Sequence, residues 1–166
     1  GSFRSQIMHS KLIFKIFRDP MTKEILTDEE NNFLEAHIPF TEILENQEDY
    51  DTVLENKDKY ILKPFDSYSS DGVYAGQEHK PEEWKEILDK AYQNDYIYQD
   101  YFNMDKVDFV EYDKEGKLHI TPFSFVMGMY IYAEQFQGLY TRIGNAALIS
   151  GARDYYTTPN ILAIEK

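Results

Sequence analysis

The pattern of hydrophobic and polar positions along the chain changes its period near residue 60. Before that point apolar residues recur at helical spacing, and the segment 6–17 predicts a first helix. The Asp-Pro dipeptide at 19–20 is expected to end this helix. A second helix is expected to begin at Thr27, because Glu30 three positions later completes a capping-box pattern. Pro39 is expected to stop that helix.

After residue 60 short segments rich in β-branched and aromatic residues predominate. Two of them, Tyr60–Lys63 and Val73–Ala75, flank a polar loop. Pro81 is expected to open a helix that runs to about Tyr92, because proline suits the first helical turn. Four longer strands are then expected, at Tyr96–Phe102, Val107–Tyr112, Leu118–Tyr132 and Phe136–Ile143.

This order of elements predicts an α+β fold, with N-terminal helices followed by a mostly antiparallel sheet, a loop and a packing helix. The chain has 166 residues, which is enough for one compact core. We expect residues 1–2 to be a tag remnant and residues 3–58 to form a helical segment, with a short helix near 50–56. Residues 59–166 are expected to carry the main site, and the whole is interpreted as one compact unit cut from a longer protein.

The segment Tyr60–Tyr74 combines a strand that carries Lys63 with a small polar loop that Gly72 closes. Such a loop offers backbone N–H groups and hydroxyls to anionic oxygens, and the lysine adds a cation. The segment therefore indicates a site for a phosphate group. The alternative interpretation is a surface lysine that binds no ligand.

The chain is acidic, with 30 Asp and Glu against 17 Lys and Arg and a net charge of −13. Nucleic acids and anionic membranes bind concentrated positive charge, so neither is expected as a partner. A phosphate ligand remains compatible with this charge, because salt screens exposed carboxylates beyond about 8 Å at physiological ionic strength. The candidate cations are Lys11, Lys63, Arg142 and Arg153.

Several chemistries are excluded by what the sequence lacks. The chain has no cysteine, which excludes disulfides, thiolate metal sites and cysteine nucleophiles. Its four histidines do not have the spacing of a metal motif, and neither a Walker A nor a dinucleotide fingerprint occurs. The longest apolar-leaning run is shorter than the ~20 residues that cross a bilayer. We expect no metal site in this chain and a cytoplasmic location.

Four short motifs together resemble the ATP-grasp ligases. More narrowly, the chain is similar to the C-terminal part of the circularly permuted group that includes glutathionylspermidine synthase, over nearly its whole length. This resemblance implies the nucleotide-binding portion of an ATP-dependent carboxylate–amine ligase that works through an acyl phosphate. The motifs are Tyr60-Ile-Leu-Lys-Pro64, the loop ending Asp71-Gly72-Val73, Tyr98-Gln-Asp-Tyr-Phe102, and Gly138-Leu-Tyr-Thr-Arg-Ile-Gly144 with Ile149-Ser150.

The resemblance implies roles for the residues on the first two motifs. Lys63 would contact the nucleotide phosphates. Lys11 matches a position where the family has a lysine, which suggests a contact with phosphate; a solvated lysine on the first helix is the alternative. The loop 67–72 would fold over the triphosphate as a lid. Within the lid, the phosphate-binding residues would be Ser67, Ser69, Ser70 and Gly72.

By the same resemblance, the remaining two motifs would bind the adenine base and stabilise the transferred phosphoryl group. The strand end would meet the adenine edge through main-chain groups and one side-chain amide, supplied by Gln99, Asp100, Tyr101 and Phe102. Arg142 resembles an arginine near the transferred phosphoryl group, where a guanidinium neutralises developing charge; a structural, salt-bridged arginine is the alternative.

ATP is the cofactor that the resemblance implies. Magnesium is expected only in a full-length parent, because the family's metal ligands would precede Phe3. The isolated chain is therefore expected not to catalyse ligation by itself.

The lid departs from the family pattern, because Ser69-Ser70-Asp71 stands where many relatives carry two glycines and a basic residue. A carboxylate on Asp71 would repel a phosphate. Two alternatives therefore stay open: a degenerate ATP-grasp protein without catalysis, and an aromatic-rich module that binds a ligand or a protein. The expected partners are a nucleotide and a small-molecule or peptide substrate. The sequence fixes neither the substrates nor the oligomeric state.

Overall fold

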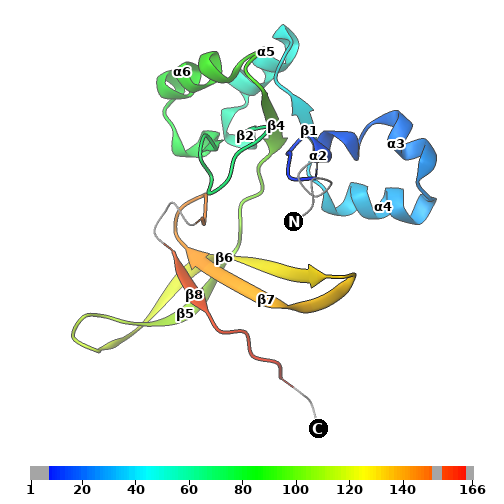
Figure 1. Ribbon diagram of the computed structural model, residues 1–166. Helices are drawn as coiled ribbons and strands as arrows, with labels where there is room; N and C mark the ends of the chain where they lie inside the picture. Colours follow the sequence, from blue (N-terminus) through cyan, green and yellow to red (C-terminus); the bar gives the residue numbers. More distant parts are fainter. Residues whose placement is uncertain (1–7, 151–154, 164–166) are drawn as a thin grey trace. The chain divides into compact units, whose positions relative to one another are not determined.

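The computed structural model describes residues 8–150 and 155–163, which fall in two compact units, Gly1–Phe102 and Asn103–Lys166. Each unit contains an antiparallel four-stranded sheet, and the described helices belong to the first unit (Figure 1). The predicted α+β class is confirmed.

Three helices begin the first unit: α2 (Ile13–Ile16), α3 (Pro20–Ile25) and α4 (Asp28–His37). The expected long first helix is reduced to the four residues of α2, and the start of that prediction, residues 6–7, lies outside the described residues. Pro20 begins a helix here, because the Asp19 carboxylate accepts the Met21 N–H at 2.9 Å and proline suits the first helical position. The capping box between Thr27 and Glu30 is present as predicted.

The sheet of the first unit has the order β1-β4-β2-β3. Its strands are β1 (Thr41–Ile43), β2 (Tyr60–Pro64), β3 (Tyr74–Ala75) and β4 (Tyr96–Asp100). The sequence pattern did not predict β1, which lies between the helices and pairs with β4. The strand Thr41–Ile43, inside the segment expected to be helical, therefore shares a sheet with strands of the region after residue 60. The chain divides into its two units after Phe102.

Two helices, α5 (Gln47–Glu55) and α6 (Pro81–Ala91), pack with one face of this sheet around Trp84. The Trp84 side chain is fully buried, and its Nε1–H donates to the Val53 carbonyl at 3.3 Å. Leu62 and Tyr98 contribute the sheet side of this core. Two short 3₁₀ turns complete the unit, η1 (Lys57–Lys59) and η2 (Gly76–Glu78).

Strand alternation places Lys63 away from that core. Leu62 pairs with Tyr98 and both join the core, so the neighbouring positions on β2 and β4 face the other side of the sheet. That second face carries Ile61 and Lys63 from β2, Gln99 from β4 and Thr41 from β1. One half-buried lysine and two buried polar residues thus share a face with the buried Ile61.

The second unit is a meander of β5 (Lys106–Tyr112), β6 (Leu118–Tyr132), β7 (Gln135–Gly144) and β8 (Tyr156–Thr158). The long strand β6 changes partner along its length. Residues 118–124 pair with β5, residues 124–132 pair with β7, and Ser124 alone belongs to both ladders. No helix in the described parts of either unit is long and apolar enough to cross a membrane.

Candidate functional site

The candidate site begins with Lys63, which is half-buried on the sheet face opposite α5 and α6. Its ammonium Nζ donates to the side-chain oxygen Oε1 of Gln99 at 2.5 Å. Burial, and secondarily the charge of Lys11, lower the pKa of Lys63 to about 8. Within the described part of the chain its hydrogen-bond partner is this neutral amide and not a carboxylate. Among the described residues, then, the lysine charge is not paired with a carboxylate.

Gln99 is held by a second residue of the same face. Its Nε2 donates to the Thr41 hydroxyl at 2.7 Å, and that hydroxyl donates to the Pro39 carbonyl at 3.0 Å. Gln99 is 4% exposed and Thr41 is 1% exposed, so both groups are removed from water. Four residues from three segments thus form one continuous chain of hydrogen bonds.

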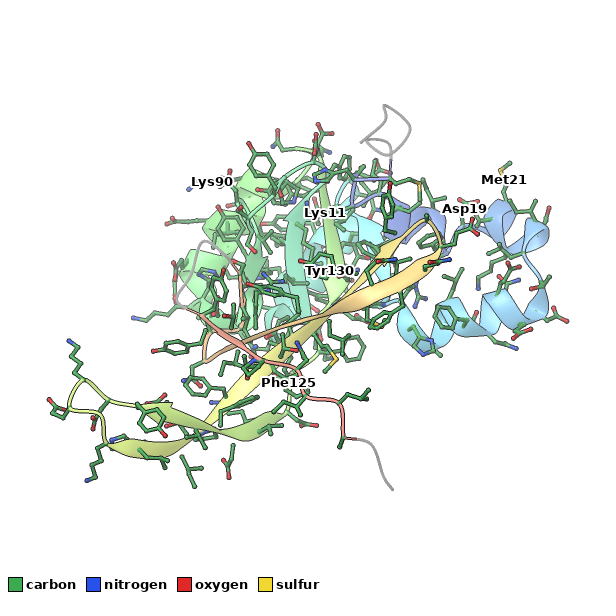
Figure 2. The ribbon with its side chains drawn as sticks, turned by 60° about the horizontal axis from the view of Figure 1, so that its bottom comes forward. Lys11, Asp19, Met21, Lys90, Phe125 and Tyr130 are labelled. Carbon is green, nitrogen blue, oxygen red and sulfur yellow. The ribbon has the colours of Figure 1, made fainter. Side chains whose placement is uncertain are left out.

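Lys11 joins this region to the start of the lid loop (Figure 2, where Lys11 is labelled). Its Nζ donates to the carbonyl of Ser67 at 2.8 Å and to the hydroxyl of Ser67 at 3.0 Å. Its backbone N–H donates to the Phe65 carbonyl at 2.8 Å. Burial lowers the pKa of Lys11, and the charge of Asp66 opposes that shift. The structure thereby brings together Lys11, Lys63, Ser67 and Gln99, four of the residues named from the sequence.

The lid loop is a compact pair of turns. Ser69 and Ser70 have φ values of 55° and 58°, and the Asp71 N–H donates to the Tyr68 carbonyl at 3.1 Å. Positive φ at both central residues is the mark of a type I′ turn. The Val73 N–H then donates to the Ser70 carbonyl at 3.2 Å, with Gly72 at φ 67°. The two serines adopt the left-handed conformation that glycines would favour.

Asp71, the residue that departs from the family pattern, is exposed at the tip of this loop. Burial raises the pKa of Tyr96, and the charges of Tyr74 and Asp71 add to that shift. Gly72 also approaches Tyr96, since a Cβ at this glycine would lie 2.8 Å from the tyrosine Oη. The Asp71 charge thus acts on the first residue of the inner strand β4.

At the end of β4, where the sequence predicts contact with adenine, two backbone N–H groups already make hydrogen bonds within the protein. The Asp100 N–H donates to the Phe40 carbonyl at 3.0 Å, and the Tyr101 N–H donates to the Lys59 carbonyl at 2.7 Å. Phe102 is 67% exposed. A pocket of about 430 Å³ adjoins this strand end and is lined by Arg18, Phe40, Asp100 and Phe102 among others. A base bound here would use carbonyl groups, Phe102 and the pocket rather than the two engaged N–H groups.

Arg142 belongs to the second unit, where it lies on β7 opposite Val126. Its guanidinium lies 5.9 Å from the centre of the Tyr140 ring, and its Nε is buried without a hydrogen-bond partner among the described residues. A cation with an unused buried donor remains chemically competent to bind an anion.

The described residues contain no group of three or more His, Asp or Glu side chains placed to hold a metal ion. The main residue that sequence reasoning did not identify is Thr41. It lies in a three-residue strand just after Pro39, where the pattern indicated only the end of a helix. The β-branched Thr and Ile of this segment are the one signal that could have revealed it.

Comparison with protein-family models and with curated proteins gave no match for this chain. The site is therefore defined by its own geometry. It consists of two partly buried lysines, a serine-rich double turn and an amide that holds one lysine without neutralising it.

Proposed function

We propose that the chain is the nucleotide-binding portion of an ATP-dependent carboxylate–amine ligase, with Lys63 as the residue that contacts phosphate. The observation that carries the proposal is the uncompensated charge of Lys63. Removing an ammonium from water without a carboxylate costs free energy, and such groups concentrate at functional sites. An anionic oxygen arriving at Lys63 would restore the missing partner.

The surroundings of Lys63 support a phosphate rather than a carboxylate as that anion. Lys11 adds a second cation close enough to lower the Lys63 pKa, so the site favours a ligand with more than one negative charge. Ser67 offers a hydroxyl beside Lys11. The β2–loop–β3–α6–β4 order is compatible with the ATP-grasp resemblance, because Lys63, the loop 67–72 and the strand with Gln99 belong to one unit.

In this proposal the ligase couples two steps. The γ-phosphoryl group of ATP passes to a substrate carboxylate, which releases ADP, and an amine then displaces phosphate from the acyl phosphate to form an amide. Lys63 and Lys11 would hold the phosphates. Magnesium and its ligands would come from the parent protein. ATP and a small-molecule or peptide substrate are the partners that follow.

The second candidate is a degenerate binding protein of the same family, without catalysis. The exposed carboxylate of Asp71 in the lid and the engaged N–H groups of Asp100 and Tyr101 favour it. Both candidates keep the phosphate contact of Lys63, so they differ in turnover and not in binding.

Titration calorimetry with ATP on the chain and on Lys63→Met tests the binding claim. We expect Lys63→Met to weaken ATP binding at least about tenfold, since a charge-assisted hydrogen bond contributes about 1.5–3 kcal/mol. Lys85→Met is the matched control, because Lys85 pairs with Asp89 on the exposed side of α6. Equal affinities of Lys63→Met and the unmodified chain would refute the role of Lys63. Phosphate release by the parent protein would then separate the ligase from the degenerate relative.

A further inference from the structure

The hydrogen-bond chain from Pro39 to Lys63 has only one consistent direction. At one end the Pro39 carbonyl can only accept, so the single proton of the Thr41 hydroxyl is committed to it. The hydroxyl therefore meets Gln99 only as an acceptor, and the NH₂ group of Gln99 must face Thr41. At the other end the Lys63 ammonium can only donate, so the amide oxygen of Gln99 must face Lys63.

A flipped Gln99 amide would be penalised at both ends. Its NH₂ group would then face the ammonium, donor against donor, and its oxygen would face a hydroxyl whose proton is already used. Since Gln99 and Thr41 are buried, water does not compensate the lost bonds. The orientation of Gln99 is thus set by a residue of β1, 58 positions earlier in the chain.

This arrangement holds Lys63 without consuming its charge. An ammonium has three N–H donors, and Gln99 takes one of them. A carboxylate in the place of the amide would bind the lysine more tightly and cancel its charge. The neutral amide instead fixes the position of Nζ and, as far as the described residues go, leaves two donors for a ligand.

We propose that Thr41 is a positioning residue for the anion site: it locks Gln99 so that Lys63 is held in place with two N–H groups reserved for a ligand that only accepts hydrogen bonds. Ionised carboxylates and phosphoryl groups both have that property, and the second cation, Lys11, favours the more highly charged phosphate or pyrophosphate group. The identification of that group as part of ATP rests on the proposed function.

The charges around Lys63 determine how the site responds to pH. Lys11 is the charged group that acts on Lys63 directly, and Asp66 acts in turn on Lys11. The Asp66 carboxylate also meets His9 Nδ1 at 3.1 Å. On β1 the neighbouring carboxylate, Glu42, is already paired with Lys15 at 2.5 Å. Because the pKa of Lys63 is about 8, anion binding should weaken as pH rises through that value.

A matched pair of substitutions tests the role of Thr41. Thr41→Ser keeps the hydroxyl, whereas Thr41→Val keeps the shape and removes it. Two quantities are measured: the affinity for inorganic pyrophosphate by calorimetry between pH 6.5 and 9.5, and the Lys63 titration by side-chain NMR without ligand. With Thr41→Val we expect about fivefold weaker binding at pH 7, equivalent to one hydrogen bond. Its Lys63 midpoint should move to lower pH, while Thr41→Ser keeps the original values.

A second substitution keeps the proposal open to refutation if Thr41→Val does not fold. Gln99→Glu retains the size of the side chain but supplies a carboxylate, so it should raise the Lys63 midpoint and weaken pyrophosphate binding. The proposal fails if Thr41→Val matches Thr41→Ser in both measurements, or if Gln99→Glu leaves the Lys63 midpoint unchanged.

The same data separate this proposal from the proposed function. Shifted Lys63 midpoints together with pyrophosphate binding but no ATP binding would uphold the role of Thr41 and reject the nucleotide. If the Lys63 midpoints do not shift but ATP binding depends on Lys63, the data would reject the role of Thr41 and uphold the nucleotide site.

Discussion

Lys63 destabilises the folded chain. On folding, its ammonium loses contact with water and gains only a hydrogen bond to a neutral amide and repulsion from the neighbouring Lys11. An apolar side chain of similar length would fill the same space without that cost. The retention of a lysine therefore makes sense if the charge is used by a ligand. Arg142 on the second unit presents a related case, since its buried Nε has no hydrogen-bond partner among the described residues.

This cost predicts a pH-dependent stability. The folded-state pKa of Lys63, about 8, lies below its ordinary value of 10.5, so between these values the unfolded chain binds more protons. The free energy of unfolding should rise with pH across this window, by about 1–2 kcal/mol between pH 7 and 9.5 given about 1.4 kcal/mol per pKa unit and partial exposure. Burial raises the pKa of Tyr98 in the folded chain, so this group opposes the effect of Lys63 once pH passes the ordinary tyrosine value of 10.0, and the comparison therefore stops at pH 9.5.

Urea unfolding of the chain and of Lys63→Met at pH 7 and pH 9.5 measures this effect. We expect the variant to be the more stable protein at pH 7, and its advantage to shrink at pH 9.5. Parallel pH profiles for the two proteins would contradict the assignment of the shift to Lys63.

The residues of the site were predictable where a local pattern carried them. Lys63 and Ser67 lie on one strand-and-loop segment, so the sequence alone could place them together. Thr41 could not be found in this way, because its role depends on a pairing with Gln99 across 58 residues. Local patterns do not report such long-range partners.

At the scale of elements, prediction succeeded where a segment was long or strongly capped. The strand Leu118–Tyr132 matches its prediction at both ends, and the Thr27 capping box starts α4 as expected. The sequence pattern did not predict β1 or α3, which are three and six residues long. In elements this short, pairing or capping outweighs the hydrophobic period.

Gly76 joins two elements and provides a test at this scale. It lies in η2, against the backbone of η1, where a Cβ would stand 1.9 Å from the Lys57 carbonyl oxygen. Because that obstacle is backbone, Gly76→Ala must push the two turns apart, and we expect a loss of about 2–4 kcal/mol in the free energy of unfolding. Gly128→Ala is the control, since its Cβ would meet the Tyr140 carbonyl at an ordinary 3.5 Å. Chemical denaturation of both variants gives the comparison.

At the scale of the molecule, the second unit carries many exposed apolar side chains on its strands. Met127, Met129 and Tyr130 on β6 are 51%, 70% and 59% exposed (Figure 2, where Phe125 and Tyr130 are labelled). The strand β6 contains no Asp, Glu, Lys or Arg. Neutral strands with exposed apolar side chains favour association with other surfaces.

Met129→Glu should therefore reduce the binding of a hydrophobic dye such as ANS and lower the light scattering of concentrated solutions. Gln135→Glu adds the same charge at an exposed position at the start of β7 and serves as the control. If both variants reduce dye binding equally, net charge and not the apolar surface of β6 is responsible.

The pairing between β1 and β4 also has a consequence for the order in which the chain folds. The ladders of the second unit join strands that are neighbours in sequence, and such local contacts form quickly. The Thr41–Gln99 contact instead forms only after a loop of 58 positions has closed. Closing this loop loses more conformational entropy than pairing two strands that are neighbours in sequence. We therefore expect the anion site to be among the last parts of the first unit to assemble. If Lys63 binds phosphate as proposed, newly synthesised chains would acquire that affinity only when this sheet is complete.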